Sequence, residues 1–403
     1  MVRAAITKAF ICGFLLASAI PTLAQDADVT QPPPPIAFEQ WREVGRSEFF
    51  TDYAVSFPSS IVTQYADNNT VRLRVVLPTD SIGAVPVVVL LHYWGASDVG
   101  IERSVARRLA EAGVASVIVP LPYHLDRTPP GHFSGELAIE PDPAKLTATM
   151  VQSVADVRRT VDWIETRSEF RHDQIGVAGT SLGALVSALA YAVEPRFAAS
   201  CYLLGGADVA HILWHSSRVV SQREELRRNG YTEDRLRSAL APIEPLNFLK
   251  EDDLRPSFVI AAKFDTVVPP ADAEKLIAAL GNVQVTWLDT GHYGGALVQA
   301  KLVRTVARFF AQTFRGPGFA APASLYAPTI RWGLEFNQEN GLQVMAGLDV
   351  WRLRADGETF AAVMVTPRGG QGFIGHTFSK NFAIGVSVLR KKTTWGVLWS
   401  IVL

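Results

Sequence analysis

The sequence predicts an α/β fold: a doubly wound, mostly parallel α/β sheet, followed by a small C-terminal antiparallel β domain. Between residues 49 and 315, short apolar stretches alternate with longer stretches of helical periodicity. The stretch at residues 85–91 is continuously apolar, as expected of a central strand covered on both faces. After residue 315 the helical periodicity stops, and the hairpin signals Asn340-Gly341 and Asp356-Gly357 follow.

Composition and charge narrow the class of protein. The chain has 403 residues, of which 48% are hydrophobic and 19% are charged. These values are ordinary for a packed globular protein, and the length leaves room for one large domain and a smaller one. The formal net charge is -1, which gives no reason to expect a nucleic acid partner.

The N-terminus has the features of an export signal. Arg3 and Lys8 precede an apolar run over residues 9–20, and small residues at 22–24 suit a cleavage site. The run is too short to span a bilayer. A buried N-terminal helix is the alternative, but a polar, proline-rich stretch follows at once. We therefore predict a signal peptide over residues 1–24, a linker over residues 25–48, and an exported protein that is periplasmic or secreted.

Cysteine usage agrees with a mature chain that lacks disulfides. Cys12 would leave with the signal peptide. Cys201 lies in a buried-strand pattern, and a single remaining cysteine has no internal partner. We expect Cys201 to be an inert core residue.

Within residues 49–315, the elements follow one another in the order that a doubly wound sheet requires. Strands are predicted at residues 70–77, 85–91, 114–119, just before Ser181, and at 198–204, 257–262 and 283–288. Helices are predicted between Ser97 and Gly113, from the Asp142-Pro143 cap to residue 164, and over residues 184–192. A Pro-, His- and Gly-rich segment (120–141) and a charged helical insertion (about 207–255) follow strand ends, where ligands bind in such sheets.

The most informative motif is Gly179-Thr-Ser181-Leu-Gly183, which stands between a short apolar strand and a helix-forming run. Strand, tight turn and helix are the context that a nucleophile elbow needs. The turn is so sharp that the residues two before and two after the serine must lack bulk. Because this five-residue pattern also occurs by chance, its catalytic role depends on whether the chain supplies a base and an acid for the serine.

A serine hydroxyl becomes a strong nucleophile only when a base removes its proton and a carboxylate orients that base. The predicted strand at 257–262 is followed by Asp265, and the one at 283–288 is followed by Asp289 and His292. Each candidate lies at the carboxyl end of its own strand, on the same edge as Ser181. We predict Ser181 as nucleophile, His292 as base and Asp265 as the acid, with Asp289 as the competing acid.

Two backbone N–H groups must also face the developing oxyanion. One is predicted from Leu182, at the start of the helix after the serine. The other is expected from the turn His92-Tyr93-Trp94-Gly95, supplied by Tyr93 or by Trp94. His92 is expected to brace this turn.

With these motifs, residues 49–315 resemble the α/β-hydrolase superfamily: a His-x-x-Gly turn, then Gly-x-Ser-x-Gly, then Asp265 and His292. The layout is most similar to exported esterases of the dienelactone-hydrolase-like and acetylxylan-esterase-like kinds. Tyr93 replaces the glycine usual after the motif histidine, and its hydroxyl contributes to the oxyanion site in some members. Dienelactone hydrolases proper use cysteine, so the serine implies ordinary ester hydrolysis.

Residues of the two insertions are candidates for the substrate pocket. Tyr123 and His124 lie in the first insertion, and Trp214 and His215 lie in the second. His124 and His132 are alternatively metal ligands, but the sequence around them supplies no carboxylate pair to complete a set. We therefore predict no metal site and no cofactor. Arg127 is either a substrate-carboxylate ligand or a solvated loop residue.

The C-terminal region leaves several readings open. Residues 316–328 resemble a linker, and residues 329–403 suggest about six short antiparallel strands in up-and-down order. Bulky apolar residues alternate with small or polar ones in the last strands, a pattern that outer-membrane strands also show. Six strands are fewer than the roughly eight of ordinary membrane barrels. We therefore favour an accessory sheet, a sugar-binding module or an oligomerisation module over outer-membrane association.

The sequence as a whole predicts an exported serine esterase that acts on a small-molecule ester through an acyl-enzyme. The same triad serves an acyltransferase or a peptidase. A non-catalytic, envelope-associated binding protein on a hydrolase scaffold is the alternative from another class.

Overall fold

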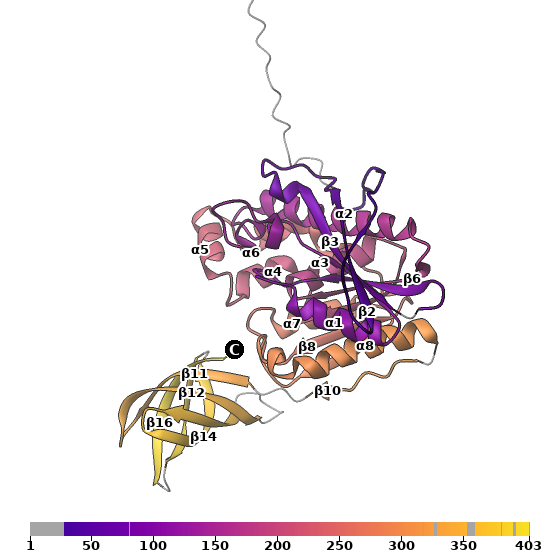
Figure 1. The fold of residues 1–403 in the computed structure, drawn as a ribbon. Helices are drawn as coiled ribbons and strands as arrows, with labels where there is room; N and C mark the ends of the chain where they lie inside the picture. The colour runs from indigo at the N-terminus through magenta and orange to yellow at the C-terminus, as the bar shows by residue number, and fades with distance from the viewer. Residues whose placement is uncertain are drawn as a thin grey trace, which may run out of the picture.

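In the computed structural model, the residues described are 28–79, 81–316, 318–325, 329–352, 359–379, 381–389 and 392–402. The predicted signal peptide and Cys12 lie outside them. Figure 1 shows two units, a large α/β unit and a C-terminal β barrel.

The α/β unit is built on a ten-stranded sheet, counted over the described residues, in the order β1-β2-β3-β5-β4-β6-β7-β8-β9-β10. The first three strands and the β3–β5 pair are antiparallel, and the pairs from β5 through β4 to β10 are parallel. The strands are β1 (Arg42–Arg46), β2 (Phe50–Pro58), β3 (Thr70–Pro78), β4 (Val85–Leu91), β5 (Ala115–Val119), β6 (Phe170–Thr180), β7 (Phe197–Leu203), β8 (Ser257–Ala262), β9 (Val283–Leu288) and β10 (Ser324–Leu325).

Helices cover both faces of this sheet (Figure 1). Helices α1 (Gly100–Glu111) and α8 (Gln299–Arg315) pack on one face, and α2 (Pro143–Glu165) and α3 (Leu182–Val193) pack on the other. Successive residues of β4 point to opposite faces, so that Val89 joins the core under α2 and α3 while Val88 joins the core under α1 and α8. The predicted doubly wound sheet is therefore confirmed.

The charged insertion after β7 is helical, as predicted. It contains α4 (Val209–His215), α5 (Val220–Arg228) and α6 (Glu233–Leu240), and α7 (Pro270–Ala278) follows β8. Short 3₁₀ helices lie in the connections, at Asp67–Asn69, Leu125–Arg127, Glu136–Ala138, Ala241–Ile243, Pro245–Asn247 and Gly294–Val298. Among the described residues, no helix combines the length and the apolar character that a membrane span requires.

Two short strands fall in segments that we predicted as linkers. Strand β1 lies within residues 25–48 and pairs with β2, and β10 lies within residues 316–328 and pairs in parallel with β9. Backbone pairing can recruit such short segments to a sheet edge whatever their side-chain pattern, and a periodicity of two residues is not visible in strands this short.

The C-terminal unit is a closed barrel of six antiparallel strands in up-and-down order. Its strands are β11 (Thr329–Asn337), β12 (Gly341–Arg352), β13 (Thr359–Thr366), β14 (Gly369–Ser379), β15 (Phe382–Leu389) and β16 (Lys392–Val402). Strand β11 also pairs with β16, which closes the sheet on itself. The six antiparallel strands were predicted, but their closure was not.

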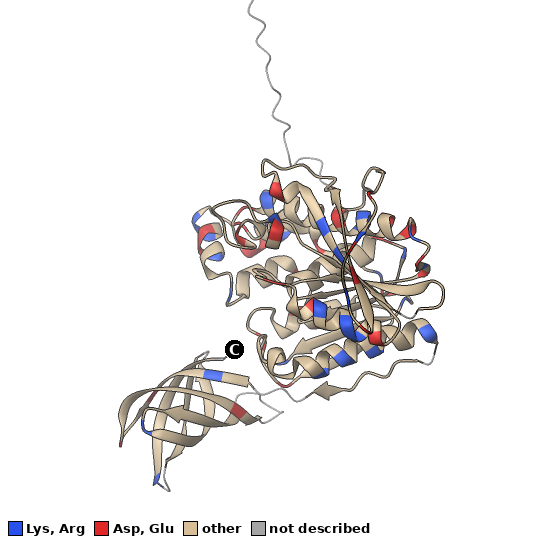
Figure 2. Ribbon diagram, viewed as in Figure 1, with Lys and Arg blue, Asp and Glu red and all other residues tan. Residues whose placement is uncertain are grey.

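The barrel has a mixed interior and an apolar outer surface. Charged residues buried inside it include Arg331, Glu335 and Asp349. The barrel also buries an apolar cluster, made of Met345, Phe360, Ala362, Met364, Phe373, Ala383 and Leu398. Its exposed large hydrophobic side chains are Trp332, Phe336, Leu342, Val344, Leu348, Val350, Trp351, Val363, Val365, Ile374, Phe378, Phe382, Ile384, Val388, Trp395 and Val397. Figure 2 shows few charged residues on the barrel ribbon and many on the helices of the α/β unit.

Candidate active site

The serine turn is strained, and glycines on both sides make it possible. Ser181 lies between β6 and α3 with φ 55 and ψ -113, a backbone conformation that residues other than glycine rarely adopt. A Cβ on Gly179 would lie 2.1 Å from the carbonyl oxygen of Gly183, and one on Gly183 would lie 2.5 Å from that of Leu91. Any larger residue at these positions would therefore collide with backbone atoms.

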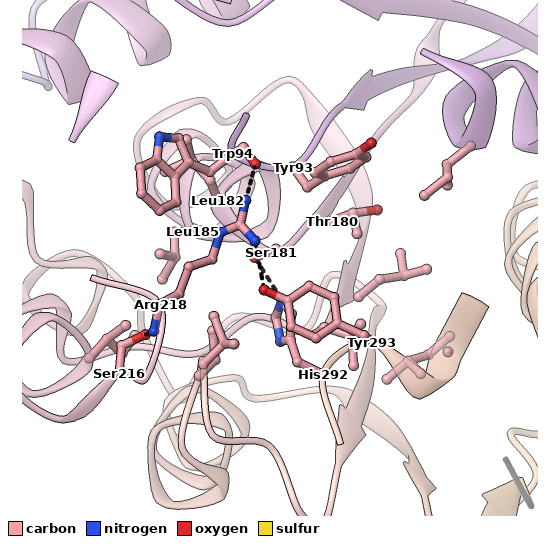
Figure 3. Close-up of a pocket in the computed structure, with 18 of the residues that line it drawn as sticks. Tyr93, Trp94, Thr180, Ser181, Leu182, Leu185, Ser216, Arg218, His292 and Tyr293 are labelled. Carbon is pink, nitrogen blue, oxygen red and sulfur yellow. Dashed lines mark hydrogen bonds between the residues drawn. The ribbon is translucent and has the colours of Figure 1, made fainter. Parts of the chain in front are cut away.

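Ser181, His292 and Asp265 form one hydrogen-bonded chain (Figure 3 shows its first two members). The His292 Nε2 atom lies 3.1 Å from the Ser181 hydroxyl oxygen, and its Nδ1 atom lies 2.7 Å from an Asp265 carboxylate oxygen. A carboxylate only accepts, so Nδ1 carries the proton and Nε2 is left to accept the hydroxyl proton. His292 and Asp265 are both buried.

Backbone contacts select Asp265 over the competing acid. The Asp265 carboxylate accepts hydrogen bonds from the backbone N–H groups of Val267 and Val268, each at 2.8 Å, which holds it facing His292. Asp289 forms an ion pair with Lys263 at 2.6 Å instead. The structure thus brings Asp265, and not Asp289, to the histidine.

The turn after β4 is held by a buried histidine. His92 Nδ1 donates to the carbonyl of Tyr93, and its Nε2 accepts from the backbone N–H of Leu121. Burial lowers the pKa of the His92 imidazole to about 4, so the ring is neutral and keeps both bonds. Tyr93 and Trp94 of this turn line the same cavity as Ser181 and Leu182.

That cavity has a volume of about 360 Å³ and a largely apolar wall. One part of the wall comes from α4 and its C-cap, where Val209, Ile212, Leu213 and the capping Ser216 recur at helical spacing and line the cavity. Leu182, Leu185, Val267 and Val268 add further apolar wall. A neutral, apolar group beside Ser181 would therefore be well accommodated.

The described wall includes none of the four residues that we predicted for the pocket. His124 is buried against His92, with ring centroids 4.9 Å apart, and the Tyr123 ring packs edge-on against Tyr65. Trp214 stacks under Arg227, and His215 pairs with Glu233. The helical phase of α4 explains the last two positions, because the turn at Asp208 directs the opposite face of the helix to the cavity.

The sequence did not single out Arg218, an exposed residue of the cavity wall (Figure 3). Its guanidinium donates to the hydroxyl of Tyr293 at 2.6 Å and to the carbonyl of Trp94 at 3.3 Å. It also lies over the Trp94 ring, 5.0 Å from the centroid. Arg218 thus links the insertion to both the oxyanion turn and the histidine loop. No short motif marks it in the sequence.

Arg127 of the first insertion has a structural partner. It is fully buried and pairs with Asp156 at 2.8 Å, so it is neither a substrate ligand nor a solvated loop residue, and both sequence interpretations of it were wrong. It anchors the segment 120–141 to α2, where burial of its charge is offset by the carboxylate.

Among the described residues, His211, His215 and Glu233 lie close enough together to hold a metal ion. Their atoms already have protein partners: His211 Nδ1 bonds to Asp272, His215 Nε2 bonds to Glu233, and Glu233 also pairs with Arg237. We therefore interpret this cluster as the ion-pair network that ties the insertion to α7.

The comparisons with known proteins agree with this geometry. Residues 43–220 match the sequence profile of the family described as alpha/beta hydrolase domain containing 18. Residues 147–317, which include Ser181, Asp265 and His292, match that of the prolyl oligopeptidase family. None of the curated proteins matches the sequence.

Solved structures share the fold. An acetyl xylan esterase from Paenibacillus sp. R4 has a TM-score of 0.54 and 19% identity, over 68% of this chain and 89% of that one. Acetyl xylan esterase 1 from Thermoanaerobacterium sp. JW/SL YS485 has a TM-score of 0.53 and 15% identity, over 72% of this chain and 90% of that one. Sheet order, serine turn and family matches together place residues 43–317 in the α/β-hydrolase superfamily.

Proposed function

We propose that this chain is an exported serine esterase that hydrolyses a small carboxylic ester through an acyl-enzyme. The observation that carries the proposal is the chain of hydrogen bonds from Ser181 through His292 to Asp265 at the wall of an apolar cavity. No step of the proposed reaction requires a metal ion or an organic cofactor.

In the first half-reaction, His292 Nε2 takes the proton of the Ser181 hydroxyl as the oxygen attacks the ester carbonyl carbon. The carbonyl oxygen becomes an oxyanion, which accepts hydrogen bonds from the backbone N–H of Leu182 and from that of Tyr93 or Trp94. The intermediate then collapses. The proton on His292 passes to the leaving alkoxide, and an alcohol departs from the acylated serine.

In the second half-reaction, His292 removes a proton from water, and the hydroxide attacks the acyl carbonyl. Collapse of that intermediate returns the proton to Ser181 and releases the carboxylic acid. Asp265 stays ionised throughout and stabilises the imidazolium that forms twice in each cycle.

The cavity supports an uncharged substrate with an apolar acyl group. Its wall is aliphatic beside Ser181, and the one guanidinium in the described wall is that of the exposed Arg218. The acetyl xylan esterases of the same fold are consistent with ester hydrolysis and short acyl groups.

The test is hydrolysis of p-nitrophenyl esters from acetyl upward, together with labelling by a fluorophosphonate probe. We expect wild type to hydrolyse the esters and to be labelled once, at Ser181. Ser181→Ala should abolish both, whereas the exposed Ser221→Ala should change neither. An unlabelled wild type that leaves all esters intact would favour a non-catalytic binding protein on a hydrolase scaffold.

The match to the prolyl oligopeptidase family keeps a peptidase as the second candidate, alongside an acyltransferase with the same triad. Adding an alcohol acceptor separates transfer from hydrolysis, because a transferase would form the new ester. Peptide p-nitroanilides separate amide from ester cleavage in the same way.

Export is the last part of the proposal and rests on the signal pattern of residues 1–24. N-terminal sequencing of the protein recovered from the periplasm or medium should begin near Gln25. Recovery only from the cytoplasm, with Met1 retained, would remove this part and leave the proposed chemistry untouched.

A further inference from the structure

The barrel buries its charges and exposes its apolar side chains. Inside, the Arg331 guanidinium makes a bidentate pair with Asp349, with both bonds at 2.9 Å, and donates to Ser400 at 2.7 Å. These three residues lie near the end of the barrel where the chain enters. The barrel also buries a small apolar cluster that includes Phe360 and Phe373, but most of its large apolar side chains are outside. A water-soluble barrel would bury them, since burial of apolar surface is the main favourable contribution to folding in water.

A second polar cluster lies toward the far end of the interior. Glu335 is fully buried, and one of its oxygens accepts from Ser387 at 2.5 Å. The other accepts from Gln343 at 2.8 Å and from Gln371 at 2.5 Å. In this cluster Gln343 Oε1 has no hydrogen-bond partner, but the Glu335 carboxylate is fully paired by protein groups. The interior charge therefore does not depend on internal water for its pairing.

Apolar side chains surround the outside of the barrel and are graded along its axis. Near the middle of the barrel wall, neighbouring strands carry exposed aliphatic residues, for example Val363, Ile374 and Ile384. Exposed aromatic rings gather toward the two ends: Trp332, Trp351, Phe378 and Phe382 at the end where the chain enters, and Phe336 and Trp395 at the other.

From these observations we infer that the outer surface of the barrel lies in the hydrocarbon of a lipid bilayer. The strands are 8 to 12 residues long. At about 3.3 Å per residue and a tilt of about 45°, nine residues span roughly 21 Å, close to the apolar band of membrane barrels. A closed sheet also leaves no unpaired backbone edge in lipid. The aromatic rings fall where interfacial belts lie.

The occupant is lipid because the apolar surface runs around the whole circumference. A single protein partner, or a second copy of the chain, would cover one side and leave the other exposed to water. Among the barrel-strand residues whose side chains the structure describes, Lys392 at the start of β16 is the only exposed Asp, Glu, Lys or Arg. The hairpins at the far end contain the charged residues Glu339 and Arg368.

Inward glycines explain how six strands close without a wide lumen. Gly375 and Gly385 lie opposite each other in neighbouring strands. A Cβ on Gly375 would lie 2.3 Å from the Phe373 ring, and one on Gly385 would lie 2.6 Å from it. The ring fills the space that two larger side chains would need. Six strands can therefore close around a filled interior, although ordinary membrane barrels have about eight strands or more.

The topology also fixes the side of the membrane. Residues at the start of β11 pair with the end of β16, with Arg331 opposite Val402, so both ends of the barrel chain emerge on one side. The α/β unit precedes β11 and therefore lies on that side, with its active site outside the bilayer. The three hairpins at the opposite end have only a few residues each.

The test uses the full-length protein and vesicles of phosphatidylcholine. We expect the protein to float with the vesicles in a density gradient and to remain bound in 1 M salt and in alkaline carbonate. Barrel tryptophan emission should be quenched by brominated acyl chains, and W332F/W351F/W395F/W399F should remove most of that quenching. A protein that stays a soluble monomer, or that salt releases from the vesicles, would overturn the inference.

A matched pair of variants tests the lipid contact itself. Ile374→Arg places a charge on the outward face near the mid-height of the barrel, and we expect the vesicle-bound fraction at equilibrium to fall by a factor of about 30 or more. Ile82→Arg, on the exposed surface of the α/β unit, should leave binding unchanged. A discrete oligomer without lipid, dissolved by Ile374→Arg, would instead show barrel-to-barrel docking and contradict the lipid assignment.

This inference and the proposed esterase fail separately. Ser181→Ala should bind vesicles as wild type does, and Ile374→Arg should still hydrolyse soluble p-nitrophenyl esters. Each measurement therefore reports on one unit of the chain.

Discussion

The two units of this chain obey opposite rules of burial. In the α/β unit, valine and leucine fill two cores between sheet and helices, and charges lie mostly outside. In the barrel, charged and amide side chains fill much of the interior, and 16 of the 25 exposed large hydrophobic residues of the described chain lie on its outer wall. This difference in burial supports the inference that the two units meet different surroundings.

The units also treat buried charge differently. In the barrel, Arg331 and Asp349 neutralise each other, and Glu335 has four side-chain donors. In the α/β unit, Asp265 accepts hydrogen bonds from backbone N–H groups and from His292, and the proposed reaction requires His292 to gain and lose a proton. The pairing in the barrel is static, whereas the proposed mechanism needs a pair whose histidine exchanges a proton.

The largest expected effect is on chemistry in the α/β unit alone. In Asp265→Asn the amide can donate to His292 Nδ1, which leaves the proton on Nε2 and prevents it from accepting the Ser181 proton. We expect kcat for p-nitrophenyl acetate to fall roughly 10⁴-fold. Asp289→Asn is the matched control and should lose little activity, because Asp289 pairs with Lys263. If Asp289→Asn lost most of its activity and Asp265→Asn lost little, Asp289 would be the orienting acid. Vesicle binding should be unaffected in both.

The sequence predicted the α/β unit well because its signals are local. Strands β4, β8 and β9 have the predicted bounds, since apolar stretches (alternating with polar residues in β9) end at clear turn residues. The elbow was visible because steric demand at Gly179 and Gly183 leaves only one residue type at each position. Arg218 was not visible, because its role depends on how a helical insertion folds back over the turn at Trp94.

The barrel shows a different limit. Alternation along β11 and β16 predicts strands, but the period is two residues whichever face is buried. Trp332 and Trp395 would be core residues in a water-soluble sheet, and they are exposed here. Closure between β11 and β16 decides which face points inward, and that pairing joins residues about 70 positions apart, as with Arg331 and Val402.

The next largest effect should appear in the barrel alone. Arg331→Met breaks the buried bidentate pair with Asp349, and breaking such a pair costs about 3–5 kcal/mol in comparable cases. We expect the barrel to unfold at lower denaturant concentration in vesicles, measured by its tryptophan emission, while esterase activity is retained. Arg46→Met, which breaks an exposed pair with Glu43 in the α/β unit, should change neither the unfolding of the barrel nor the unfolding of the α/β unit. An unchanged barrel transition in Arg331→Met would mean that the interior is hydrated.

A smaller effect distinguishes a buried carboxyl of the α/β unit. Glu102, in α1 beneath the serine strand, is almost fully buried, and burial together with the nearby Asp98 charge raises its pKa to about 7. The folded state therefore holds this proton more tightly than the unfolded state does. Its contribution to stability is complete below the unfolded pKa of 4.5 and is lost as pH rises toward 7.

Glu102→Gln should remove that loss. We expect the variant to exceed wild type in free energy of unfolding by about 2–4 kcal/mol at pH 8, and to match it near pH 4.5. Denaturant titration of the α/β unit at the two pH values measures the difference. The buried His92 acts in the opposite direction, since burial lowers its pKa to about 4 and acid destabilises its neutral form; it is common to both proteins and cancels. A constant offset at both pH values would show that Glu102 is not the titrating group.

The smallest expected effect concerns Arg218, whose role in the α/β unit differs from that of Arg331 in the barrel. Arg331 is enclosed in the barrel, whereas Arg218 is an exposed residue of the cavity wall that bonds to the turn proposed to supply an oxyanion N–H. Arg218→Met should lower kcat for p-nitrophenyl acetate about tenfold with little change in KM, because the lost bond to the Trp94 carbonyl matters most when the oxyanion forms. Arg227→Met, which removes a charge from α5 outside the cavity wall, is the matched control and should retain full activity. A rise in KM at constant kcat would instead assign Arg218 to substrate binding.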